Sequence, residues 1–170
     1  GDVYKRQAIN SLTPRVEPPS ATPCPPGCDA CARACPMGAI GPSGLDATRC
    51  MRYAMDGAAY PFSVYEAQRT HMGCELCQAV CPQNAMLPQG APSEAERVAF
   101  ALPRLIAGDA AAARRFVGRN ITGNGKLTAE AVCFAARDGL YAAGIRAALG
   151  TSPFPAVKRA AAWALQRYFS

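Results

Sequence analysis

The spacing of the cysteines constrains this chain more than any other feature of its sequence. Eight of the nine cysteines lie in two runs, and each run contains a C-x-x-C-x-x-x-C-P core. The first core covers residues 28–36 and has Cys24 upstream of it, and the second covers residues 74–82 and has Cys50 upstream. Four thiolates in each run meet the requirement of two [4Fe–4S] clusters.

The cysteine before each proline is expected to ligate the opposite cluster, as it does in two-cluster ferredoxins. This exchange would tie both runs into one small domain and bring the clusters close enough for rapid electron hopping. Cluster I would then be held by Cys24, Cys28, Cys31 and Cys81, and cluster II by Cys50, Cys74, Cys77 and Cys35. The fourth ligand of each cluster stays open, because Cys24 is spaced one residue further than usual from its core and Cys50 lies far from its own.

The spacing argues against two other interpretations of the cysteines. Zinc sites pair two C-x-x-C units and have no need of the C-x-x-x-C-P element. A disulfide scaffold is typical of small secreted chains, but no secretory signal pattern is present, which fits a reducing cytoplasm. The ninth cysteine, Cys133, is expected to be a buried apolar residue. The single histidine, His71, is either a loop residue or a donor beside cluster II.

Charge is distributed unevenly along the chain. Residues 1–96 carry 7 basic and 9 acidic side chains, whereas residues 97–170 carry 11 basic and 3 acidic side chains. This excess predicts either a solvated helix surface or contact with a polyanion. The candidate phosphate-binding residues are Arg114, Arg115, Arg119, Lys126, Lys158, Arg159 and Arg167. No apolar run reaches the roughly 18 residues of a membrane span, so no membrane association is expected.

Four segments are expected. Residues 1–7 resemble a translated sequencing adapter, which with the missing initiator Met predicts a truncated reading frame. Residues 8–23 form a Pro-rich linker. Residues 24–92 form a double-cluster domain with a small hairpin at 37–46 and a short helix containing Cys50. Residues 93–170 form short helices in the manner of HEAT repeats, starting with a capping box at 93–96, and Thr128 is expected to cap a later one.

The ordered set of motifs resembles epoxyqueuosine reductase, the cobalamin and iron–sulfur enzyme of queuosine tRNA modification. The resemblance lies in residues 27–40, in the isolated Cys50 with residues 45–49, in the G-C-x-x-C-Q-x-V-C-P-x-N string at 73–84, and in residues 156–165, which resemble a HEAT repeat. It departs at Gln83, where many members have Trp, and the tail matches only in outline, so a paralogue acting on another substrate is possible.

The resemblance implies an α+β, mostly α protein in which a ferredoxin-like double [4Fe–4S] domain precedes an α-helical HEAT-like tail. It implies that the eight cysteines pass electrons from an external donor to a cobalamin in an upstream domain, that the basic tail helps hold tRNA, and that this fragment is inactive alone. No catalytic residue is expected within it, and the protein is expected to be cytoplasmic and monomeric. The alternative is a non-enzymatic dicluster carrier with a helical docking tail.

Overall fold

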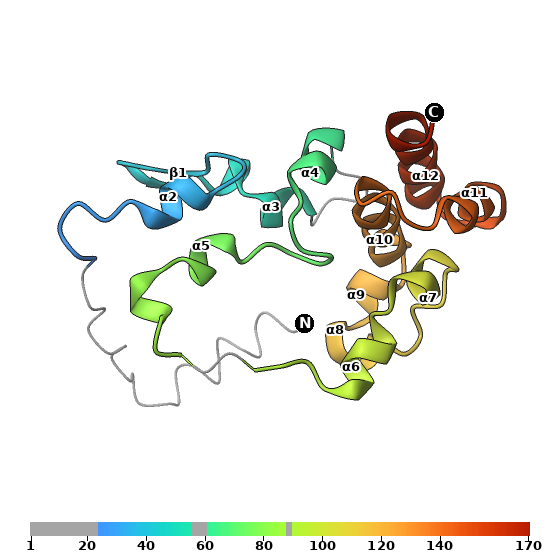
Figure 1. Cartoon of the computed structure of the whole chain (residues 1–170), viewed down its shortest axis with the longest axis horizontal. Coiled ribbons are helices and arrows are strands. Elements are labelled where there is room, and N and C mark those ends of the chain that lie inside the picture. The colour runs from blue at the N-terminus through green and yellow to red at the C-terminus, as the bar shows by residue number, and fades with distance from the viewer. Residues whose placement is uncertain (1–23, 56–60, 88–89) are drawn as a thin grey trace, which may run out of the picture.

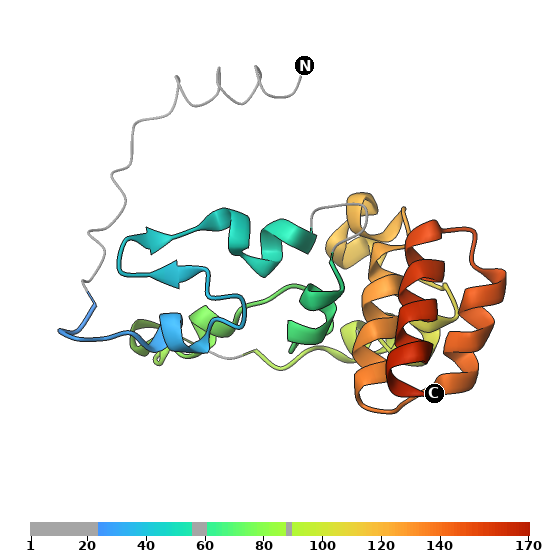
Figure 2. The same ribbon diagram turned by 90° about the horizontal axis from the view of Figure 1, so that it is seen from above.

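A computed structural model describes residues 24–55, 61–87 and 90–170. The two cysteine cores lie at one end of the molecule and the long helices at the other, as Figures 1 and 2 show. The described residues are mostly helical with one two-stranded sheet, which confirms the α+β, mostly α expectation. The expected adapter segment, residues 1–7, and the Pro-rich linker, residues 8–23, lie outside the described residues.

The cysteine region contains only short elements. In chain order they are α2 (Ala30–Ala34), β1 (Ile40–Gly41), β2 (Gly44–Leu45), η1 (Ala47–Arg49), α3 (Met51–Met55), α4 (Phe62–Ala67), α5 (Leu76–Ala79) and η2 (Pro82–Asn84).

The helical region follows. It consists of α6 (Glu94–Ala99), α7 (Leu102–Ile106), α8 (Arg114–Val117), α9 (Arg119–Thr122), α10 (Lys126–Arg137), α11 (Ala142–Thr151) and α12 (Pro155–Tyr168). Among the described residues, no helix is long and apolar enough to cross a membrane.

The hairpin expected after the first core is present. Strands β1 and β2 pair antiparallel, with Ile40 opposite Leu45 and Gly41 opposite Gly44. Asp46 then starts η1, because its carboxylate accepts hydrogen bonds from the Thr48 amide at 3.0 Å and the Thr48 hydroxyl at 2.6 Å. The prediction of a short helix that contains Cys50 is wrong in one respect. Cys50 is extended, with ψ of 132°, and separates η1 from α3.

The helical region begins as its capping signals predict. The Ser93 hydroxyl accepts the Glu96 amide at 3.3 Å, and the Glu96 carboxylate accepts the Ser93 amide at 2.8 Å, which is a complete capping box. The expectation that Thr128 caps the next long helix is wrong. Helix α10 already starts at Lys126, whose amide donates to the Asn124 side chain at 3.1 Å, and Thr128 is buried inside the helix.

Helix α10 is the centre of the hydrophobic core. It packs on α12 and α7, and α12 packs on α11 in turn. Small side chains allow this close packing, since Ala131, Ala135, Ala160 and Ala164 are fully buried where the helices meet. The three longest helices therefore form one packed layer, visible side by side in Figure 2.

The segment between the two cysteine cores is joined to this helical core. The Phe62 ring stacks on Trp163 of α12 with centroids 5.1 Å apart and an interplanar angle of 5°. Val64 and Tyr65 are buried in the same cluster. Arg137 of α10 donates a hydrogen bond to the Gln68 carbonyl. Residues 61–73 thus contact the helical region. The predicted boundary assigns them to the 24–92 domain, and this boundary stays a prediction.

His71 lies at this junction. Its ring is 6.0 Å from Phe134 of α10, and the Gln68 side chain donates to its backbone carbonyl at 2.7 Å. Burial lowers the pKa of His71 to about 4, and a hydrogen bond with the Leu127 backbone, which raises the pKa, is the smaller effect. His71 therefore faces the helical core as a neutral ring, and among the described residues it does not line the cavity between the cysteines.

The partly buried His71 should make the free energy of unfolding depend on pH. The folded state has the lower pKa, so the unfolded chain binds the extra proton and stability is lost as pH falls below about 6.5. Between pH 7.5 and pH 5 the free energy of unfolding should fall by about 2 kcal/mol more than in a His71→Gln variant. Anaerobic urea titrations of both proteins at the two pH values measure this difference. An equal fall in both would contradict it.

Two glycines of positive φ form a matched pair for a stability test. Gly125, at φ of 77°, starts α10, and a Cβ there would lie 2.7 Å from the Phe154 side chain. Gly139, at φ of 70°, would place a Cβ in open space. Gly139→Ala should cost only the left-handed strain of about 1 kcal/mol, and Gly125→Ala about 3 kcal/mol, because overpacking is added. Urea unfolding of the two variants compares them, and equal losses would contradict this account.

Candidate metal centre

The two cysteine cores repeat one local structure. In each, an acidic residue precedes a short helix: Asp29 with φ and ψ of −129° and 17°, and Glu75 with −128° and 16°. In each, the last cysteine is extended, Cys35 with −71° and 110°, and Cys81 with −71° and 121°. The identical spacing therefore produces closely similar backbone turns, and the middle cysteine of each core lies on its helix.

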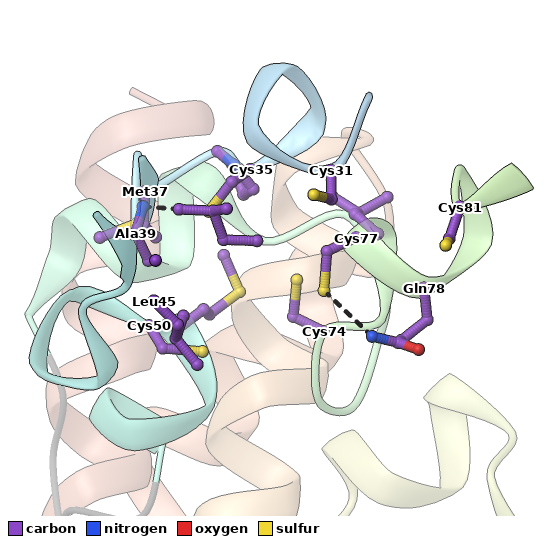
Figure 3. A pocket seen from close by; sticks show the side chains of 15 residues that line it. Cys31, Cys35, Met37, Ala39, Leu45, Cys50, Cys74, Cys77, Gln78 and Cys81 are labelled. Atoms are coloured by element: carbon purple, nitrogen blue, oxygen red, sulfur yellow. Dashed lines mark hydrogen bonds between the residues drawn. The ribbon is translucent and has the colours of Figure 1, made fainter. Parts of the chain in front are cut away.

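The two turns face each other. Helices α2 and α5 are in contact, and together with β1, β2 and the start of α3 they enclose a cavity of about 320 Å³. Six thiols line it, namely Cys31, Cys35, Cys50, Cys74, Cys77 and Cys81. In the view of Figure 3, Cys35 and Cys50 lie on one side of this group and Cys81 on the other.

The predicted ligand sets are placed differently by the structure. All four residues proposed for cluster II line the cavity: Cys35, Cys50, Cys74 and Cys77. Of the set proposed for cluster I, Cys31 and Cys81 line it. Cys28 is half-buried, with its amide bonded to the Pro25 carbonyl at 3.0 Å, and Cys24 is exposed at the start of the described chain. The structure thus brings six of the eight predicted ligands together.

The donor set and the walls of the cavity fit an iron–sulfur cluster. Apolar side chains, among them Met37, Leu45, Met51 and Leu76, complete the lining around the thiols. Within the described ranges, no three His, Cys, Asp or Glu side chains are close enough to share one metal ion. A single zinc ion would need thiolates at about 2.3 Å. Soft thiolates spread around a larger apolar cavity are the ligands that an iron–sulfur cube uses.

Two polar contacts to sulfur were not recognised from the sequence. The Ala39 amide donates to the Cys35 sulfur at 3.2 Å, and the Gln78 side chain lies 3.9 Å from the Cys77 sulfur. Asn84 holds Gln78 in place with two hydrogen bonds of 3.0 Å, to its carbonyl and to its side-chain oxygen. Gln78 and Asn84 both belong to the C-Q-x-V-C-P-x-N string, and this string is the sequence signal from which their contacts could be predicted.

The ninth cysteine is separate from this centre. Cys133 is buried within α10 and has an exposed fraction of 2%. Burial is the largest cause of the raised pKa of its thiol, and the nearby Glu130 adds to it. The prediction of a buried apolar residue is therefore confirmed. No disulfide joins any of the nine cysteines, all of which lie in the described part of the chain.

The basic residues of the tail lie on several elements. Arg114 and Arg115 are on α8 and Arg119 is on the adjoining α9, all three exposed. Lys126 starts α10, and Lys158 and Arg159 are exposed on α12. Two of these cations also lie over aromatic rings, with Arg115 4.7 Å from the centroid of Phe116 and Arg159 4.8 Å from that of Phe62. Their contact with nucleic acid stays a prediction.

Comparison with known proteins gives a family match for part of the chain. Residues 24–84 match the family model described as a 4Fe-4S double cluster binding domain. This match covers both cores, Cys24 and Cys50, and agrees with the independent spacing argument for two clusters. A comparison with curated protein sequences finds no match.

Three solved structures share the fold. The epoxyqueuosine reductase of Bacillus subtilis has a TM-score of 0.63 and 24% identity, over 88% of this chain and 44% of that one. A selenomethionine-labelled epoxyqueuosine reductase has a TM-score of 0.65 and 24% identity, over 82% and 40%. An epoxyqueuosine reductase with an epoxyqueuosine-modified tRNA-Tyr stem loop has a TM-score of 0.62 and 23% identity, over 82% and 40%. The chain therefore spans less than half the length of the structures that it matches.

These observations agree with one another. The repeated turns, the six thiols around one cavity and the double-cluster family match describe the same segment of the chain. The chain has the fold of the corresponding part of epoxyqueuosine reductases, with its double [4Fe–4S] cluster-binding segment at residues 24–84.

Proposed function

We propose that this chain is the electron-relay part of an epoxyqueuosine reductase-like oxidoreductase. The observation that carries the proposal is the convergence of six thiols from three chain segments on one cavity, in a fold shared with those reductases. When bound, the two clusters would accept and pass on single electrons.

The ligand sets proposed from the sequence are retained. Cluster I would be held by Cys24, Cys28, Cys31 and Cys81, and cluster II by Cys35, Cys50, Cys74 and Cys77. Apolar side chains line the cavity around the second set, and the Ala39 amide donates to the Cys35 sulfur. Hydrogen bonds to ligand sulfurs and exclusion of solvent are two of the means by which a protein sets cluster potential.

The remainder of the reaction is proposed for the intact protein. A cobalamin held by a domain outside this sequence would receive the electrons, which an external donor supplies. Reductive removal of the epoxide oxygen from a modified tRNA base would follow, within queuosine biosynthesis. The support is the fold shared with a reductase solved with an epoxyqueuosine-modified tRNA stem loop. The helical tail would act as a HEAT-like platform, in a cytoplasmic and monomeric protein, and the present chain alone would be inactive.

The second candidate is a non-enzymatic dicluster electron carrier with a helical docking tail. The double-cluster match at residues 24–84 is common to both functions. The complete gene distinguishes them, since an upstream corrinoid-binding domain of about 150–200 residues supports the enzyme. A reading frame without such a domain would favour the carrier.

Iron counting with EPR tests the two-cluster assignment and the exchange of ligands. The anaerobically reconstituted chain should hold about eight irons, in two interacting S = ½ centres when reduced. Cys35→Ala should leave about four irons and abolish the same EPR signal as Cys74→Ala, although Cys35 belongs to the first core. Cys28→Ala should abolish the other signal.

Cys133→Ala is the matched control, because it removes a thiol that is buried away from the cavity. It should keep about eight irons. Four or fewer irons in the parent chain would reject the two-cluster assignment. Loss of the same signal in Cys35→Ala and Cys28→Ala would reject the exchange and assign Cys35 to the cluster of its own core.

A salt titration tests the tRNA contact of the tail. Each phosphate contact adds about 0.7 to 0.9 to the slope of log affinity against log salt concentration. Replacing Arg114, Arg115 and Arg119 with Gln should reduce that slope by about 2 for a tRNA stem loop. Arg97→Gln is the control, because Arg97 lies on α6 rather than on α8 or α9, and its guanidinium forms a salt bridge of 2.8 Å with Glu94. An unchanged slope in the triple variant would remove these residues from the interface.

A further inference from the structure

Two arginines flank Cys50 and extend to two different segments of the chain. Arg49 ends η1 and Arg52 lies in the first turn of α3, so Cys50 is between them. Their guanidinium groups lie against Gly38 and Gly73, which border the first and the second cysteine core, respectively. The three segments that supply Cys35, Cys50 and Cys74 to the cavity are therefore linked through these two side chains.

Arg49 contacts the chain as it leaves the first core. Its Nη2 donates a hydrogen bond of 3.3 Å to the carbonyl of Met37, two residues after Cys35. A Cβ on Gly38 would lie 3.0 Å from the same nitrogen, and Gly38 has a φ of 57°. The glycine thus provides both the backbone turn and the space that the guanidinium occupies.

Arg52 makes the matching contact where the chain enters the second core. Gly73 has a φ of 74°, and a Cβ there would lie 2.6 Å from Nη1 of Arg52 and 3.7 Å from its Cδ. Gly73 is buried, its carbonyl accepts the Thr70 hydroxyl at 2.7 Å, and Cys74 follows directly. Because consecutive Cα atoms are about 3.8 Å apart, this positive charge lies beside the backbone of a predicted ligand.

The neighbouring charges differ between the two arginines. Asp46 lies near Arg49, and the pKa of its carboxyl is lowered first by its hydrogen bond from Thr48 and to a smaller extent by the Arg49 charge. Arg52 forms no salt bridge with any carboxylate of the described residues. The acidic side chain next to Cys74 is Glu75, which is exposed. Arg52 is therefore the less neutralised of the two cations within that part of the chain.

We propose that Arg49 and Arg52 are positioning residues of cluster II that also raise its reduction potential relative to cluster I. The inference rests on the proposed function, since it takes Cys35, Cys50, Cys74 and Cys77 as one ligand set. The two side chains hold the first and second cores against the Cys50 segment and place fixed positive charges beside them. Reduction adds one negative charge to a thiolate-bound cluster, and a nearby cation favours the more negative state.

The test is a potentiometric EPR titration of the reconstituted chain with dithionite as the electron source. Cluster II is identified as the signal that Cys74→Ala abolishes. Arg52→Gln should shift its reduction equilibrium about tenfold toward the oxidised state, which is 59 mV for a one-electron couple. Arg52→Lys keeps the charge and should shift it less than about threefold. Arg49→Gln and Arg49→Lys should give smaller shifts than the same substitutions at Arg52, because Asp46 partly offsets the Arg49 charge. At both positions the Gln variant should shift the equilibrium more than the Lys variant.

Arg97→Gln is the control, because it removes an exposed arginine from α6 that is already paired with Glu94. Unchanged potentials in Arg52→Gln at full iron content would overturn the inference, and so would equal shifts in Arg52→Gln and Arg52→Lys. If Arg52→Gln loads only about four irons and Arg52→Lys about eight, the positioning role is supported, because the charge then decides whether the second cluster assembles. Loss of iron in both Arg52→Gln and Arg52→Lys would overturn the inference that the positive charge of Arg52 acts on cluster II. Failure of the proposed function is a separate result, since it appears as four or fewer irons in the parent chain.

Discussion

Thiols from three separate segments converge on one cavity, and the elements that hold them are too short to be stable alone. Helices α2 and α5 have five and four residues, and each strand has two. Isolated helices of fewer than about 12–15 residues are marginal in water. The arrangement of the cysteines must therefore depend on packing against other parts of the chain and, when loaded, on the bonds to iron, because metal binding in such small domains is coupled to folding.

The helical region supplies that packing from one side. Phe62 stacks on Trp163, and Arg137 binds the Gln68 carbonyl, so the chain approaching the second core is anchored to α10 and α12. Next to the first core, Met37 packs against the hydrophobic cluster. The core is also connected through the contact of α2 with α5 and through the Arg49 guanidinium at Met37. A substitution in the helical core could thus alter the cysteine region although it contacts no cysteine.

Local signals in the sequence predicted local structure well. The Gly/Pro turn predicted the hairpin of β1 and β2, and Ser93 with Glu96 predicted the capping box of α6. The errors arose where two signals competed. Thr128 suits a helix cap, but Asn124 and the left-handed Gly125 start α10 earlier and Thr128 is buried within it.

The sequence by itself determined the chemistry of this protein. Thiolates in two C-x-x-C-x-x-x-C-P cores leave few cofactors other than iron–sulfur clusters, because ligand type and spacing are covalent properties of the chain. Only the tertiary structure decided which thiols share a cavity, that His71 faces α10, and that Arg49 and Arg52 reach Gly38 and Gly73. These outcomes depend on how distant segments pack, and no local pattern of residues encodes the distance between two segments that meet only in the folded chain.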